Sequence, residues 1–172
     1  PYDPDTNQHW TALCGIEVLL AHADTWPAQK SEYGPVLTDL LSYGEGLSAS
    51  EVGEALQWRL IYNGKVSRMM EPVDVLLLPI TGARMPELDN EIGNPSGGDG
   101  ADLGDLLKFT APADLTGFPT LTLPGGFDSR GAPLGFQLMG KPLSEGLLLQ
   151  AGHAFQTVTD LHCKRPDLSA FS

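Results

Sequence analysis

Residues 73–79 read VDVLLLP, a short apolar run that is closed by a proline. A run of this length suits a β-strand that is covered on both faces, as strands in parallel sheets are. We therefore expect a strand over residues 74–79. Such a strand needs a partner on each edge and a cover on each face, because open apolar edges are prone to pair with other chains.

Two further strands are expected downstream. Residues 120–124, TLTLP, alternate and carry threonine at every second position, and residues 134–139 read LGFQLM. Between them lies the turn-forming segment 125–132, GGFDSRGA, so the spacing is typical of a hairpin. Three strands cannot cover both edges and both faces of the strand over 74–79. We infer that the chain docks against additional sheet.

Helices are expected around these strands. Their predicted ranges are about 8–30 with a break or kink at Pro27, 35–43, 48–70, 101–109 and 144–161. Ser48 followed by Glu51 is typical of a capping box at the start of a helix. The last helix is expected to bury a stripe at spacings of three and four, formed by Leu147, Ala151, Ala154, Val158 and Leu161. Residues 80–104 are interpreted as a long loop.

The composition is that of a globular protein, with 41% hydrophobic and 19% charged residues and a net charge of −12. An acidic surface repels phosphate backbones and anionic lipid, so neither nucleic acid nor a membrane is expected as a partner. Two cysteines are too few for a disulfide scaffold and are interpreted as reduced thiols. With no signal peptide recognised, a cytoplasmic location is expected.

No familiar catalytic constellation is found among the residues. None of the five lysines has a serine three residues before it, and Gly-x-Ser-x-Gly is absent. His-x-x-x-His and Cys-x-x-Cys are also absent, so neither a metal nor a cofactor is expected. An independent hydrolase that pairs Cys14 or Cys163 with one of the four histidines stays open as an alternative.

Several phrases, taken in order, resemble the C-terminal part of the amidase signature family. They are VDVLLLPIT at 73–81, FTAPADLTGFP at 109–119, TLTLPGGF at 120–127, GAPLGFQLMGKPLSE at 131–145 and the closing helix at 147–162. The ordered set is specific, and the resemblance is strongest from about 73 to 166. It departs at Asp114, where the family usually has Asn. It also departs at Leu107, where the amidotransferases that process glutamine carry Asp, which argues against a glutamine-dependent tRNA amidotransferase.

The resemblance implies an α/β fold, namely part of an α/β/α sandwich built around a mixed sheet. Residues 1–172 are then the C-terminal portion of a single amidase domain. The family cleaves amide carbon–nitrogen bonds with a Ser–cis-Ser–Lys triad. That triad is expected in an N-terminal portion absent from this chain, so no catalytic residue is assigned here.

Substrate-binding residues are expected at Phe109, Thr110 and Asp114. They lie in a stretch rich in proline and glycine that precedes a strand, and polar groups on such rigid loops often build sites. The alternative is a tight turn in which Asp114 bonds its own backbone. The helix at 144–161 is expected to be purely structural.

The expected partners are a small-molecule amide substrate and the missing N-terminal portion of the fold, with a homodimer as a further candidate. An alternative to the enzymatic interpretation is a non-catalytic scaffold or interaction subunit that retains the end of the amidase fold.

Overall fold

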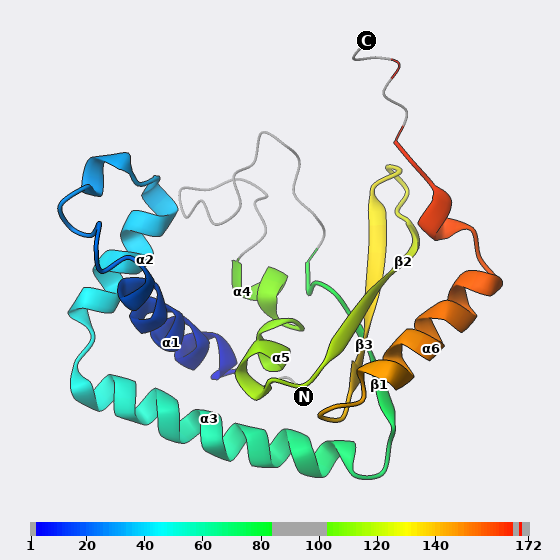
Figure 1. Ribbon diagram of the computed structural model, residues 1–172, viewed down its shortest axis with the longest axis horizontal. Coiled ribbons are helices and arrows are strands. Elements are labelled where there is room, and N and C mark those ends of the chain that lie inside the picture. Colours follow the sequence, from blue (N-terminus) through cyan, green and yellow to red (C-terminus); the bar gives the residue numbers. More distant parts are fainter. Residues whose placement is uncertain (1–2, 84–102, 167–168, 170–172) are drawn as a thin grey trace. The chain divides into compact units, whose positions relative to one another are not determined.

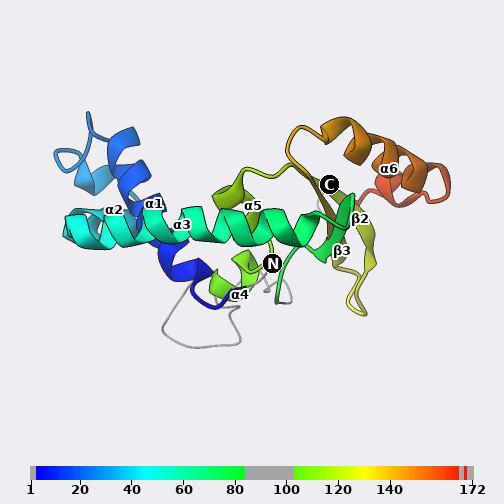
Figure 2. The ribbon, with the colours of Figure 1, turned by 90° about the horizontal axis from the view of Figure 1, so that it is seen from below.

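The computed structural model describes residues 3–83, 103–166 and 169, which form two compact units (Figures 1 and 2). The helical unit comprises Pro1–Met69 and Thr81–Thr116. The sheet unit comprises Met70–Ile80 and Gly117–Ser172. Most of the loop predicted over 80–104 lies outside the described residues.

The helical unit holds the first five helices and one 3-10 turn, whose bounds are α1 Thr6–Ala21, η1 Lys30–Glu32, α2 Pro35–Gly46, α3 Ala49–Met70, α4 Leu103–Leu107 and α5 Ala111–Thr116. The capping box at the start of α3 is confirmed. The backbone N–H and hydroxyl of Ser48 both donate to Glu51 Oε2 at 2.7 Å, and the Glu51 N–H donates to Ser48 Oγ at 3.2 Å. Two backbone N–H groups that a helix start leaves free are thereby satisfied.

The prediction of one helix from 8 to 30 is wrong in its second half. Helix α1 ends at Ala21, and the N–H groups of Thr25 and Trp26 both donate to the carbonyl of His22 in a tight turn. Pro27 keeps the chain from resuming a helix across this turn, because it has no N–H and disfavours helical backbone in the residue before it.

Helix α2 continues past the predicted end at Tyr43, and its Gly44 has a packing role instead. A Cβ added to Gly44 would lie 2.4 Å from the carbonyl oxygen of Gly15 on α1. The two helices therefore approach each other more closely than any larger residue at Gly44 allows.

The three predicted strands are confirmed as β1 Val75–Pro79, β2 Thr120–Phe127 and β3 Pro133–Gly140. They form one sheet in the order β1-β3-β2. Both pairings are antiparallel, with Leu77 and Leu121 each opposite Leu138, so the apolar run of β1 is not in a parallel ladder here. A register shift between Pro124 and Gly126 bends β2 near the hairpin tip.

Helix α6, Glu145–Thr157, packs on β2 and β3, and the 3-10 turn η2, Leu161–Cys163, follows it (Figure 2). The helix is shorter than predicted and ends at Thr157. Gly152 lies against Leu121 and Leu123, and Phe155 meets Phe136 edge to face at 5.1 Å between ring centroids. These contacts confirm a mixed α/β architecture. Among the described helices, none is long and apolar enough to cross a membrane.

Candidate substrate-binding site

The three predicted site residues lie at the junction of α4 and α5. Phe109 and Thr110 form the turn between these helices, and Asp114 lies within α5. The irregular loop expected from residue 109 is therefore in large part a short helix, which ends where Gly117 adopts a φ of +71°.

The turn residues have local backbone roles. The carbonyl of Thr110 accepts hydrogen bonds from the N–H groups of Ala113 and Asp114 at 2.9 and 3.3 Å, and its hydroxyl donates to the Leu107 carbonyl at 3.3 Å. Thr110 thus starts α5, and its side chain is occupied locally. The exposed Asp114 carboxylate, by contrast, has no hydrogen bond or ion pair within the described chain, so the alternative of a turn bonded to its own backbone gains no support.

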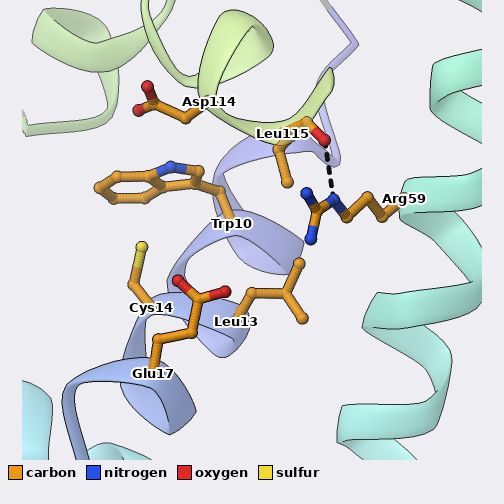
Figure 3. Close-up of a pocket in the computed structure, with 7 residues that line it drawn as sticks. All are labelled: Trp10, Leu13, Cys14, Glu17, Arg59, Asp114 and Leu115. Carbon is orange, nitrogen blue, oxygen red and sulfur yellow. Dashed lines mark hydrogen bonds between the residues drawn. The ribbon is translucent and has the colours of Figure 1, made fainter. Parts of the chain in front are cut away.

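Asp114 borders a pocket of about 230 Å³ inside the helical unit (Figure 3). Three helices line it: Trp10, Leu13, Cys14 and Glu17 come from α1, Arg59 from α3, and Asp114 and Leu115 from α5. The α1 residues are spaced by three, four and seven, which places them on one helix face. In the view of Figure 3 the Trp10 ring lies between the Asp114 carboxylate and the side chains of Cys14 and Glu17.

Arg59 connects two walls of this pocket. Its Nε donates to the carbonyl oxygen of Leu115 at 2.7 Å, near the end of α5. A short helix leaves its last carbonyls without partners inside the helix, so this bond satisfies one of them. The bond also holds α5 against α3 and so helps to position Asp114.

The electrostatics of the pocket do not favour a reactive thiol. Burial raises the pKa of Cys14 to about 11, and the nearby carboxylates of Glu17 and Asp114 add to the effect. At neutral pH Cys14 is therefore a neutral thiol, whereas nucleophilic attack needs the thiolate. No described histidine hydrogen-bonds to either cysteine: His9 stacks on Trp58, and His22 contacts the Tyr33 hydroxyl at 3.0 Å. The Cys–His alternative thus gains no support.

A second pocket of about 400 Å³ adjoins the first and shares Trp10 with it. Its walls carry no charge and are formed by Asn7, Gln8, Trp10, Thr11, Tyr43, Gly104 and Leu107.

Sequence reasoning therefore found one pocket residue and missed the others. Asp114 lines the first pocket, whereas Phe109 and Thr110 line neither. The spacing of Trp10, Cys14 and Glu17 was a usable signal, since it follows one helix face. The contribution of Arg59 carries no such signal, because it depends on how α3 packs.

In the described part of the chain, no three His, Cys, Asp or Glu side chains gather as a metal site would require.

Comparison with known sequences places these observations in a family. A family model described as Amidase matches residues 29–149. The putative amidase AmiD of Mycobacterium tuberculosis is 40% identical over 151 residues, which is 88% of this chain and 31% of that protein. A glutamyl-tRNA(Gln) amidotransferase chain of Rhodopirellula baltica is 33% identical over 131 residues, 76% of this chain and 25% of that protein.

Solved structures share the fold. A crystal structure of an amidase superposes with a TM-score of 0.78 at 25% identity and covers 90% of this chain and 35% of its own. The 6-aminohexanoate cyclic dimer hydrolase in complex with its substrate gives a TM-score of 0.77 at 22% identity, covering 96% of this chain and 37% of its own. The chain thus spans about a quarter to a third of the length of the proteins it matches.

Proposed function

Because the chain belongs to the amidase family, we propose that it is part of an enzyme that hydrolyses the carbon–nitrogen bond of a small-molecule amide. The observation that carries the proposal is the family match over residues 29–149, the region that contains α5 and the sheet. In this proposal residues 1–172 are the C-terminal portion of a single amidase domain. The N-terminal portion supplies the Ser–cis-Ser–Lys triad.

The part assigned to this chain is binding and orientation of the substrate. Glu17 and Asp114 offer carboxylates that are unpaired within the described chain and can accept hydrogen bonds from an amide or amine N–H, and Trp10 offers a flat apolar wall. Phe109 and Thr110 hold the turn that starts α5 and so position Asp114. Holding a substrate in position for attack by a nucleophile from another part of the enzyme lowers the entropic part of the activation barrier.

The experiment compares the full-length protein with residues 1–172 alone. The full-length protein should hydrolyse simple aryl or alkyl amides, whereas this chain alone should show no turnover above background. Asp114→Ala and Phe109→Ala in the full-length protein should change kcat or KM about tenfold while the melting temperature stays within a few degrees. Asp24→Ala, which removes another exposed carboxylate outside the pocket, is the matched control and should change neither constant.

Two results would reject this assignment. Turnover by the isolated chain would place the chemistry within residues 1–172. Asp114 and Phe109 variants that unfold, yet keep normal specific activity in the folded fraction, would show that α5 is only structural.

A second candidate function is a non-catalytic scaffold that keeps the end of the fold. One observation favours it, namely that Cys14, the thiol that lines the first pocket, is held neutral and is therefore not an activated nucleophile. The sequence upstream of Pro1 distinguishes the two candidates. A serine- and glycine-rich segment there would support the enzyme, and its absence from the complete reading frame would support the scaffold.

A further inference from the structure

A third pocket, of about 570 Å³, lies within the sheet unit, between the tip of the β2–β3 hairpin and the segment that follows α6. One wall comes from β2, β3 and the hairpin turn, and the other from η2 and residues 164–166. Strand β2 and η2 lie beside each other (Figure 1). The pocket shares no lining residue with the two pockets described above. Its volume is within the range of roughly 300–1,000 Å³ that is typical of small-molecule sites.

The walls of this pocket are mainly apolar and rigid. Their apolar members are Pro124, Phe127, Pro133, Leu161 and Pro166. Phe127 is paired with Pro133 across the hairpin and is 51% exposed. A proline ring has almost no side-chain freedom to lose, so a ligand that packs against three prolines orders little of the protein. The pocket therefore suits the apolar body of a small molecule.

The hairpin turn is held by Asp128, and its carboxylate is engaged in doing so. Asp128 Oδ1 accepts hydrogen bonds from the backbone N–H groups of Arg130 and Ala132 at 2.8 and 3.0 Å. Its Oδ2 lies 3.0 Å from Nε of Arg130 in an ion pair. The charge of this carboxylate is thus offset within the turn, so it does little to repel an anion from the neighbouring pocket.

The polar lining residues are His162, Lys164 and Arg165, and no carboxylate is among the described residues that line the pocket. Lys164 is paired with Asp160, whose Oδ2 lies 2.6 Å from the Lys164 Nζ, so the charge of Lys164 is largely offset. Arg165 is held by the backbone instead: its Nη1 donates to the carbonyls of His162 and Lys164 at 3.1 and 2.8 Å. Within the described chain, Nε and Nη2 of Arg165 have no hydrogen-bond partner and no carboxylate pairs with this guanidinium.

The charge at this pocket differs from that of the chain as a whole. The net charge is −12, yet the sheet unit contains four of the ten Lys and Arg residues and only six of the 22 Asp and Glu residues. Exposed charges more than about 8 Å apart are largely screened at physiological ionic strength. The guanidinium of Arg165 therefore matters more to an anion in this pocket than the net charge of the chain does.

We propose that this pocket binds a small carboxylate with an apolar body, such as an arylalkanoate, with the carboxylate on Arg165 and the apolar body against Phe127 and the prolines. A guanidinium can donate two parallel N–H bonds to a carboxylate, and Nε and Nη2 of Arg165 are the nitrogens available for this. One uncompensated positive charge matches a monoanion better than a phosphate dianion, whose second charge would lack a partner. The proposal does not depend on the amidase function proposed above.

The test is isothermal titration calorimetry of the full-length protein with 4-phenylbutanoate and with 4-phenylbutan-1-ol, which share one apolar body. The carboxylate should bind at least about tenfold more tightly than the alcohol. Arg165→Gln should remove this difference, whereas Arg165→Lys, which keeps the charge but not the planar fork, should keep part of it. Lys141→Gln is the matched control, because it removes a positive charge beyond the opposite end of β3, and it should change the affinity less than about twofold.

Amide hydrogen exchange of the full-length protein gives the location of the bound ligand. Saturating 4-phenylbutanoate should slow exchange in peptides that cover residues 124–133 and 161–166, because a bound ligand opposes local opening. Phe127→Ala should weaken the carboxylate and the alcohol alike, since it removes an apolar wall that both would contact. Arg165 and Phe127 are both exposed, so their variants should keep the melting temperature within a few degrees.

Four outcomes would overturn the proposal: no binding of 4-phenylbutanoate at millimolar concentration, equal affinity for the carboxylate and the alcohol, an affinity that Arg165→Gln leaves unchanged, or slowed exchange that does not include the hairpin. Failure of the proposed amidase function is distinguishable, because calorimetry requires no turnover. A full-length protein that binds 4-phenylbutanoate here without hydrolysing amides would reject only the chemistry, and one that hydrolyses amides without this binding would reject only the site.

Discussion

The two units of this protein use their side chains differently. In the helical unit, residues from α1, α3 and α5 direct polar groups to one pocket, and the carboxylates of Glu17 and Asp114 have no partners in the described chain. In the sheet unit, β2, β3 and α6 bury leucine, methionine and phenylalanine side chains against one another. The helical unit thus differs from the sheet unit in holding this polar pocket, whereas both units bury apolar side chains.

The two units also differ in how far apart in the sequence their contacting residues lie. The strands β2 and β3 are joined by a short hairpin, so their pairing is local in sequence. The pocket instead joins α1 to α5 across about a hundred residues, and it depends on how closely the helices approach. Substitutions at the pocket should therefore act on geometry or reactivity, whereas substitutions at buried positions of either unit should act on packing energy.

The largest expected effect tests the apolar core of the sheet unit. Leu148 of α6 is 2% exposed, whereas its neighbour Leu149 is 63% exposed. Leu148→Ala should lower the free energy of unfolding by about 2–5 kcal/mol, because it removes buried methyl groups and leaves a cavity. Leu149→Ala is the matched control and should cost less than about 0.5 kcal/mol. Urea unfolding followed by circular dichroism measures both, and equal losses would show that α6 does not pack as described.

The next effect tests the polar pocket through the reactivity of Cys14. With its pKa raised to about 11, the thiol should react with iodoacetamide at pH 8 on the order of a hundredfold more slowly than an ordinary cysteine thiol. Glu17→Gln removes one of the charges that raise this pKa, so the rate should increase. The measurement is alkylation followed by mass spectrometry in a Cys163→Ser background. A rate equal to that of N-acetylcysteine would mean that the pocket does not raise the pKa of the Cys14 thiol.

The same pKa gives a stability trend with a definite sign. The folded-state pKa of Cys14 lies above its ordinary value of 9.0, so folding favours the neutral thiol. The contribution to stability is full below pH 9 and is lost as the pH rises toward about 11. Cys14→Ala should therefore flatten the alkaline limb of a stability–pH curve, and an unchanged limb would contradict the shift.

A smaller effect tests the close approach of α1 and α2. Gly44→Ala would place its Cβ against the backbone of Gly15, so it should cost about 1–3 kcal/mol. Gly46→Ala, in the same helix, meets no atom within 4 Å and should stabilise the protein by up to about 1 kcal/mol. Thermal unfolding of the two variants should show shifts of opposite sign. Shifts of the same sign would mean that the contact does not limit the helix spacing.

The smallest effect concerns the start of α3. Ser48→Ala removes the side chain that caps this helix and should cost about 1 kcal/mol, whereas Ser67→Ala, on the exposed face of the same helix, should change stability by only a few tenths. The bonds from Ser48 also hold the pKa of Glu51 below its ordinary value of 4.5. The stabilisation is thus present above that value and is lost as the pH falls. An equal effect of both serine variants would show that the cap is not formed in solution.

Local patterns predicted those elements whose causes are local. The strands over 74–79, 120–124 and 134–139 and the capping box at Ser48 were all confirmed, because proline, glycine and capping residues act on their immediate neighbours. Helix faces were harder to predict. The stripe expected on the last helix, with Leu147 and Val158, is largely exposed, and the buried side instead carries Leu148 and Gly152.

The sequence by itself determined the family and the three strands, and it singled out Asp114 as a candidate binding residue. Only the tertiary structure decided that Asp114 shares a pocket with Trp10 and Glu17, and that β1 lies at an open edge of the described sheet. The physical reason is that both outcomes depend on contacts between segments far apart in the chain. A helix or strand pattern states that a face is apolar, but the neighbours present in the fold decide whether that face is covered.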